Sequence, residues 1–264
     1  MITLLHKYGK TIAIVATQSL NDAIWGLIGD FALRLFHVAI LLSLWRTVMA
    51  GQGVVAGMSL EAVLTYTMVA AIFADQLSGR TRIDDDLWSG NIANRFLRPM
   101  GIYGQMLAEM VGSWIPGLLF FALPLLLIAP LLGVDPFPAT WTAGLWFLLS
   151  LALGVAVGTA LDLFFAACMV FLEHSVYALQ RIRTTLTVLL SGRLVPLALL
   201  PWGLGDYLEW LPFASLASAP LRLYTGTGDP HYLIPLQATW AVVLWVSAHA
   251  LWCHNRERLV SHGG

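Results

Sequence analysis

Long apolar segments recur along the chain and predict membrane-spanning helices. A span needs about 20 mostly apolar residues, and the sequence contains six such segments. The third and fourth are the most apolar, whereas the second is short and the fifth begins with charged residues. We therefore predict an all-α integral membrane protein with a single transmembrane domain over residues 1–264, whose six transmembrane helices cover 27–49, 59–76, 113–132, 141–172, 181–200 and 233–252.

The N-terminal residues 1–22 show a different, amphipathic pattern. Lys7 and Lys10 interrupt the segment, and no apolar core precedes a cleavage site, so the segment is unlike a signal peptide. Its apolar residues recur at helical spacing, which favours an interfacial helix lying in the membrane surface over a mobile tail. They are Ile2, Leu5, Tyr8, Ile12 and Val15.

The most charged stretch of the chain lies between the second and third spans, at residues 78–100. Gly90 and Pro99 divide and end its helical pattern. Each half carries apolar residues on one helical face. We predict a kinked, amphipathic cytoplasmic helix suited to docking a partner protein, with the apolar residues Ile83, Leu87 and Trp88 in its first half and Ile92, Phe96 and Leu97 in its second.

Three consecutive acids, Asp84, Asp85 and Asp86, fall in the first turn of this helix. A helix N-terminus favours anions, so the simplest interpretation is three solvated acids that cap the helix. A metal site would need a second acidic or histidine arm, and none is nearby. An aspartate-rich diphosphate-binding motif, D-D-x-x-D, would need an acid at the position that Trp88 occupies. We therefore predict no metal site here.

Prolines and glycines break the pattern in the second half of the chain. Pro196 and Pro201 interrupt the fifth span. Further along the chain, Pro212 ends a short helix over Tyr207–Leu211. Non-helical backbone at membrane depth is tolerated where it is buried in protein or lines a water-filled cavity. Short re-entrant helices in an outer segment at 201–232 fit this pattern, and so does a plain span with an outer loop.

Composition supports the membrane assignment. The chain is 58% hydrophobic and 11% charged, with a mean hydropathy of +0.76, whereas a soluble domain carries about 25% charged residues. The net charge of −1 offers no basic field for nucleic acid. Two cysteines in apolar stretches do not make a disulfide framework or a zinc site.

The distribution of Lys and Arg predicts the topology. With the N-terminus in the cytoplasm, ten of the fourteen basic residues fall in cytoplasmic segments and two, Arg46 and Arg222, in outer ones. Basic residues concentrate on the cytoplasmic side of membrane proteins. We therefore expect a multi-pass protein with both termini in the cytoplasm.

The chain resembles the type-2 ATP-binding-cassette (ABC) transporter permeases, in particular their viologen- or drug-exporter-like branch. The run Ser89–Met100 is similar to an S-G-x-x-x-x-x-L-L-R-P-L signature, and Phe171–Glu173 to an F-L-E motif. The resemblance covers nearly the whole chain. Further similarity lies in S-G-x-L-V-P-L-x-x-x-P from Ser191 to Pro201, then in Leu211–Phe213, Pro220 and Tyr224–Gly226.

The resemblance implies a permease subunit in the cytoplasmic membrane of a prokaryote. Two copies of a separate ATP-binding subunit would carry ATP and Mg²⁺, and a second permease, identical or homologous, would complete the path. The sequence agrees, because its G-K-T at Gly9–Thr11 has Leu4 where a phosphate-binding loop needs glycine. We expect no catalytic residue, metal or cofactor in this chain. The coupling helix would comprise Ile83, Asp84, Asp85, Asp86, Leu87, Trp88, Ile92, Phe96 and Leu97, and the link Glu173–Gln180 would be a secondary contact.

Charged residues inside spans are costly and tend to face a bundle interior or a water-filled path. Asp30, Arg34 and His37 share one stripe of the first span. They predict either a self-neutralising Asp30–Arg34 pair or a stripe that faces the dimer interface or the cytoplasmic vestibule. Asp162 has no charge one turn away, so it is either partnered across helices or protonated. Arg193 would meet an anion, a substrate carboxylate or a lipid headgroup.

Three classes of function remain open at this point. The first is an ABC exporter permease that moves an amphipathic or hydrophobic compound. The second is a proton-coupled secondary transporter that uses Asp30, Asp162 or Glu109. The third, a membrane-embedded enzyme, lacks a convergent catalytic set.

Overall fold

The computed structural model describes residues 2–21, 24–98, 100–171 and 176–254. Its regular structure is helical apart from one short hairpin. The elements are α1 Ile2–Asn21, α2 Ile24–Val48, β1 Val54–Val55, β2 Met58–Ser59, α3 Leu60–Ile72, α4 Ile83–Trp88, α5 Ile92–Phe96, α6 Ile102–Gly117, α7 Leu123–Ile128, α8 Trp141–Phe171, α9 Val176–Leu190, α10 Leu204–Glu209, α11 Ser218–Tyr224 and α12 Pro230–His254.

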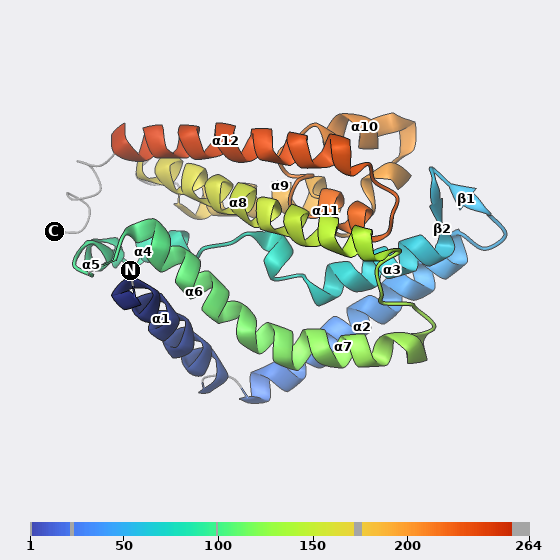
Figure 1. The fold of residues 1–264 in the computed structure, drawn as a ribbon, viewed down its shortest axis with the longest axis horizontal. Helices are drawn as coiled ribbons and strands as arrows, with labels where there is room; N and C mark the ends of the chain where they lie inside the picture. The colour runs from blue at the N-terminus through green and yellow to red at the C-terminus, as the bar shows by residue number, and fades with distance from the viewer. Residues whose placement is uncertain (1, 22–23, 99, 172–175, 255–264) are drawn as a thin grey trace.

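The long helices run back and forth along the longest axis of the molecule. Figure 1 shows α4 and α5 at one end, beside the start of α1 and the end of α12. The hairpin β1–β2 and helix α10 lie at the opposite end. The prediction that the α4–α5 end faces the cytoplasm rests on the distribution of Lys and Arg.

Four described helices are long and apolar enough to cross a membrane, at Gly29–Val48, Ile102–Leu132, Trp141–Phe171 and Pro230–His254. Six continuous spans are therefore not seen in the described residues. Helix α3 has 13 residues, a length of about 20 Å against a hydrocarbon core of about 30 Å.

The segment predicted as a fifth span at 181–200 departs most from expectation. Helix α9 ends at Leu190, and residues 191–195 are non-helical. Gly192 adopts a φ of +76°, in the left-handed region that ends helices. Pro196 follows four residues later and cannot rejoin the helix hydrogen bonding. The broken segment then leads into the short helices α10 and α11, as the proline pattern suggested.

The third predicted span begins earlier than the sequence indicated. Helices α6 and α7 form one helical stretch over residues 102–132, joined by a π-helical turn at Leu118–Ala122. Pro116 and Pro124 flank this turn. A proline inside a helix removes a backbone donor and crowds the preceding turn, and a wider turn accommodates it.

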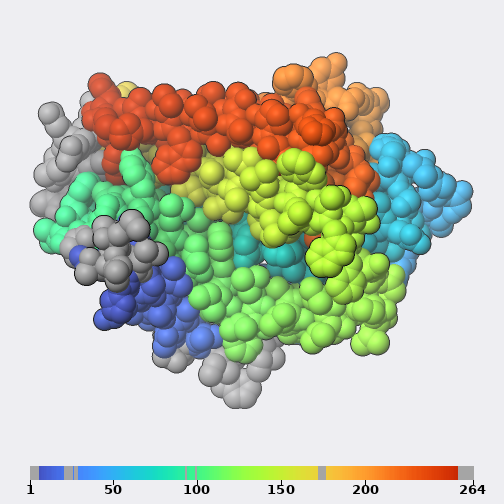
Figure 2. Space-filling view, viewed as in Figure 1, coloured from blue at the N-terminus to red at the C-terminus, as the bar shows by residue number. Residues whose placement is uncertain are grey.

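Helix α3 lies at the centre of the molecule. Eight of its thirteen residues are buried, and Figure 2 leaves only small teal areas of this part of the chain visible, between the yellow of α8 and the green of α6 and α7. Tyr66 and Met68 are among the largest fully buried side chains. Because protein surrounds it, α3 does not need the length of a lipid-exposed helix.

Helix α1 packs along α6 through two glycines. A Cβ on Gly112 would lie 2.8 Å from the carbonyl oxygen of Ile12, and one on Gly104 would lie 2.5 Å from the Tyr8 hydroxyl. The absence of side chains at these positions lets the helices approach closely. The apolar face of α1 is thus turned towards α6, and the interfacial location of this helix stays a prediction.

Candidate functional site

The inner loop between α3 and α6 forms two short helices anchored by isoleucines. Ile83 of α4 and Ile92 of α5 are 0% and 2% exposed. Both join a buried cluster that includes Met106 of α6, Leu163 of α8 and Trp252 of α12. These two residues, which the sequence analysis assigned to a contact surface, therefore hold the loop onto the long helices.

The three acids of α4 lie in ion pairs rather than standing free as solvated caps. Asp84 is buried and accepts a hydrogen bond from Arg80 at 2.7 Å. Asp85, which is exposed, lies 3.3 Å from Arg82. The sequence interpretation missed these pairs because both arginines precede the helix that they hold. The acids fix the orientation of α4.

Arg95 connects the third acid, Asp86, to helix α6. Its guanidinium contacts Asp86 and lies 2.7 Å from Glu109, which also pairs with Arg98 at 2.9 Å. Burial lowers the pKa of Arg95, but its hydrogen bonds and charge interactions with Glu109 and Asp86 outweigh this and raise that pKa above its ordinary value. Arg95 therefore stays charged, and α5 is bound to both α4 and α6.

Three apolar side chains point away from this anchored loop. Trp88 is 61% exposed, Phe96 43% and Leu97 84%, whereas Leu87 is half-buried. Trp88 makes an edge contact with Tyr177 of α9, with ring centroids 4.3 Å apart. We call Trp88, Phe96 and Leu97 the docking face. Leu87 packs against the same buried cluster as Ile83 and Ile92. The nine predicted coupling residues thus divide into three inward-facing apolar residues, three ion-paired acids and the three residues of this outward face.

Asp162 forms a buried joint between three segments. Its carboxylate lies 2.8 Å from Nε of Arg183 on α9, with the two side chains 4% and 6% exposed. It also accepts hydrogen bonds from the backbone N–H and the hydroxyl of Thr81, just before α4. Its partner is therefore across helices, one of the two alternatives in the sequence analysis.

Two glycines tighten this joint. A Cβ on Gly79 would lie 2.5 Å from the Cα of Gly158, and Gly79 has a φ of +57°. The backbone entering the loop thus lies directly against α8. Gly158 belongs to α8, and its close neighbour is this loop segment.

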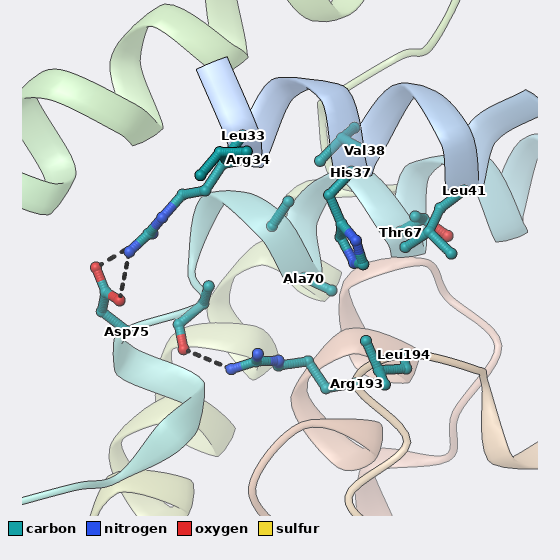
Figure 3. Close-up of a pocket in the computed structure, with 12 residues that line it drawn as sticks. Leu33, Arg34, His37, Val38, Leu41, Thr67, Ala70, Asp75, Arg193 and Leu194 are labelled. Carbon is teal, nitrogen blue, oxygen red and sulfur yellow. Dashed lines mark hydrogen bonds and ion pairs between the residues drawn. The ribbon is translucent and has the colours of Figure 1, made fainter. Parts of the chain in front are cut away.

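An open cavity lies between α2, α3 and the break after α9. It has a volume of about 440 Å³ and is lined by twelve residues, including Arg34, His37, Asp75 and Arg193. Figure 3 shows Arg34 and His37 extending from α2, and Arg193 reaching across from the break. We call this space the α2–α3 cavity. Three of the five predicted pathway residues meet there, and Asp30 and Asp162 do not line it.

Arg34 pairs with an acid that the sequence analysis did not consider. Its Nη2 atom lies 3.2 Å from Oδ1 of Asp75, just after α3, and its guanidinium stacks over Phe121. Asp30 is exposed and forms no ion pair within the described residues. The proposed Asp30–Arg34 pair is therefore not formed. The sequence did offer a signal for this pair, because Asp75 lies at the end of the second predicted span and Arg34 lies in the first.

One predicted contact falls partly outside the described residues. Glu173, in the link between α8 and α9, is not described, and neither are Arg256 and Arg258, which entered the topology count. The described part of the chain contains no group of three or more His, Cys, Asp or Glu residues arranged to hold a metal ion.

The comparisons with known proteins bear directly on this architecture. A search of curated proteins found no significant match. A family model described as "ABC-2 family transporter protein" matches residues 35–263. The match includes the inner loop, the break after α9 and α12, and it begins one residue after Arg34 of the cavity. This family is typically a non-catalytic permease that works with an ATP-binding partner. The chain therefore belongs to the ABC-2 transporter family, as a membrane component.

Proposed function

We propose that this chain is the permease subunit of an ABC exporter. It forms the translocation path together with a second permease, identical or homologous, and moves an amphipathic or hydrophobic compound. Two copies of a separate ATP-binding subunit supply the energy. The observation that carries the proposal is the docking face, where Trp88, Phe96 and Leu97 are exposed on a loop held by ion pairs.

Exposed aromatic side chains on a rigid support are typical of a protein contact. Interfaces concentrate their energy in a few aromatic anchors surrounded by polar groups. Here the exposed Arg98 directly follows Leu97 of the docking face. Since Ile83 and Ile92 fasten the loop to α6, α8 and α12, a force on the docking face reaches the long helices.

The surface of α9 supports a second permease. Arg181, Thr184 and Thr185 are exposed on this helix, which packs on α8 and α4. A polar helix face at membrane depth is costly against lipid and is satisfied by protein or by a water-filled path. A second permease that covers α9 would provide protein contacts for these side chains and would enclose a water-filled path beside them.

The test is co-purification of the tagged chain from its native membrane in mild detergent, followed by mass spectrometry. We expect a soluble protein with a phosphate-binding loop to co-purify, and Trp88→Glu and Phe96→Glu each to abolish its recovery. A second six-span protein in the sample would identify a heterologous permease pair.

Trp210→Glu is the matched control. Trp210 is also 61% exposed, and it follows α10 at the opposite end of the molecule. We expect this variant to retain the ATPase. Recovery of the chain without any ATPase, or equal loss in all three variants, would refute the docking face as the coupling site.

A further inference from the structure

We propose that the α2–α3 cavity binds the anionic group of an amphipathic molecule, and that Arg193 is the residue that contacts the anion. This inference rests on the proposed function, because it names the chemistry that the translocation path accepts. Its evidence is the charge balance of the cavity, the break after α9 and the shape of the apolar lining.

The cavity has one cation more than its acids can pair. Arg34 and Arg193 line it with a single carboxylate, that of Asp75. Arg34 engages Asp75 at 3.2 Å. Within the described residues Arg193 has no ion pair, and its side chain donates a hydrogen bond to the carbonyl oxygen of Ala74 at 3.3 Å. Most of the five N–H donors of Arg193 therefore remain available to a ligand.

The position of this cation favours an anion beside it. Leu33 and Leu41, which line the cavity with Arg193, belong to the apolar stretch Gly29–Val48 that could cross a membrane. A charged group at such a depth is expensive unless a counter-charge or water meets it. Arg193 is only half-buried and lines the open cavity, so a ligand can reach it.

The backbone at Arg193 is built to be non-helical. The carbonyl oxygen of Gly192 accepts a hydrogen bond from the Tyr66 hydroxyl at 2.7 Å, and the N–H of Ser218 donates to the carbonyl of Ser191 at 2.9 Å. A Cβ on Gly192 would lie 2.8 Å from Leu197. Broken helices at membrane depth mark ligand sites in transporters, and this break directs an arginine into a cavity.

The rest of the lining fits an apolar body. Leu33, Val38, Leu41 and Leu194 line the cavity beside the two guanidinium groups. Leu33 is 67% exposed and continues into an exposed apolar face of α2 that includes Phe36. A space of about 440 Å³ lies within the range of small-molecule sites. A molecule with an anionic head and an apolar tail would place its head at Arg193 and its tail along α2, whereas a cationic head would meet two guanidinium groups.

The experiment measures binding to the full chain in nanodiscs of zwitterionic phosphatidylcholine. The probes are dansyl-labelled undecanoic acid and its neutral methyl ester, detected by energy transfer from the tryptophans. We expect the acid to bind at least about tenfold more tightly than the ester, and Arg193→Gln to remove that preference, as losing a charged hydrogen bond predicts. Arg193→Lys should retain part of it.

Arg46→Gln is the matched control, because Arg46 also donates to a backbone carbonyl, that of Leu132, but lies outside the cavity. It should leave the preference for the acid unchanged. Equal binding of acid and ester to the wild-type chain would overturn the proposal. So would dissociation of a permease dimer by Arg193→Gln, since Arg193 would then serve the contact between two copies.

A second arm separates a lipid headgroup from a transported compound. If phosphatidylglycerol in the nanodisc displaces the acid from the wild-type chain, the anion that binds there is a lipid headgroup. If the acid still binds, the anion belongs to a cargo molecule. Neither measurement uses the ATPase, so acid binding at Arg193 in a chain that recruits no ATPase would refute the proposed function and leave this site standing.

Discussion

The pair formed by Asp162 and Arg183 gives a sharp test of how the inner loop is held. The two side chains are 4% and 6% exposed and lie 2.8 Å apart. Removing one partner of a buried ion pair leaves an uncompensated charge and costs about 3–5 kcal/mol, whereas removing both is often nearly neutral. We therefore expect Asp162→Asn and Arg183→Met each to destabilise the protein strongly, and the double variant to be more stable than the sum of the two effects predicts.

The expected sizes follow from burial. A loss of about 3–5 kcal/mol corresponds to a fall in Tm of about 6–20 °C for a chain of this size. The double variant should recover about 2–3 kcal/mol relative to the sum of the single effects. Arg183→Met should cost less than Asp162→Asn, since Thr81 still donates two hydrogen bonds to the remaining carboxylate.

The assay is thermal unfolding of each purified variant, followed by tryptophan fluorescence. Arg82→Met is the control, because Arg82 and its partner Asp85 are 71% and 53% exposed. An exposed pair contributes at most about 1 kcal/mol, so this variant should lower the Tm by less than about 4 °C. Strictly additive losses from Asp162→Asn and Arg183→Met, or losses no larger than that of Arg82→Met, would refute the buried joint.

Two further predictions use the same unfolding assay. Gly79→Ala should lower the free energy of unfolding more than the control Gly57→Ala does. Both glycines have a positive φ, at which a side chain destabilises the backbone by about 1–2 kcal/mol. Only at Gly79 would the added Cβ also clash with Gly158, at 2.5 Å. Equal losses would show that the close approach to α8 is unimportant. Gln237→Leu should cost about 1–3 kcal/mol, because Gln237 is fully buried and donates to the carbonyl oxygen of Ser215 at 2.8 Å. An unchanged Tm would mean that this carbonyl finds another donor.

The long helices could be predicted from the sequence because the bilayer leaves few alternatives. A run of about 20 apolar residues must pair its own backbone groups, and a helix does so. The length of an apolar segment did not predict the length of the helix where protein, and not lipid, surrounds that helix. Helix α3 ends at Ile72 and does not need to span the bilayer, because the surrounding helices bury it. Helix α9 ends at Leu190, and Tyr66 and Ser218 form hydrogen bonds with the backbone beyond it.

The partners of the charged residues could not be predicted from the sequence, for a different reason. Spacing along one helix predicts neighbours three or four residues apart, so it suggested Asp30 as the partner of Arg34. The observed partner is Asp75, 41 residues away. Asp162 likewise pairs with Arg183 on the next helix. A single sequence shows that these charged residues need partners, but it does not show which segments the fold brings together.

Helix α9 joins the three features on which the proposals rest. Tyr177 near its start touches Trp88 of the docking face, and Arg183 in its middle forms the buried joint with Asp162. Leu190 ends the helix, about 10 Å further along its axis, and Arg193 then enters the α2–α3 cavity. A helix transmits displacement along its length because its backbone hydrogen bonds resist bending. On the proposed function, an ATPase bound at the docking face would act on the start of α9, and the end of this helix leads to Arg193 in the α2–α3 cavity.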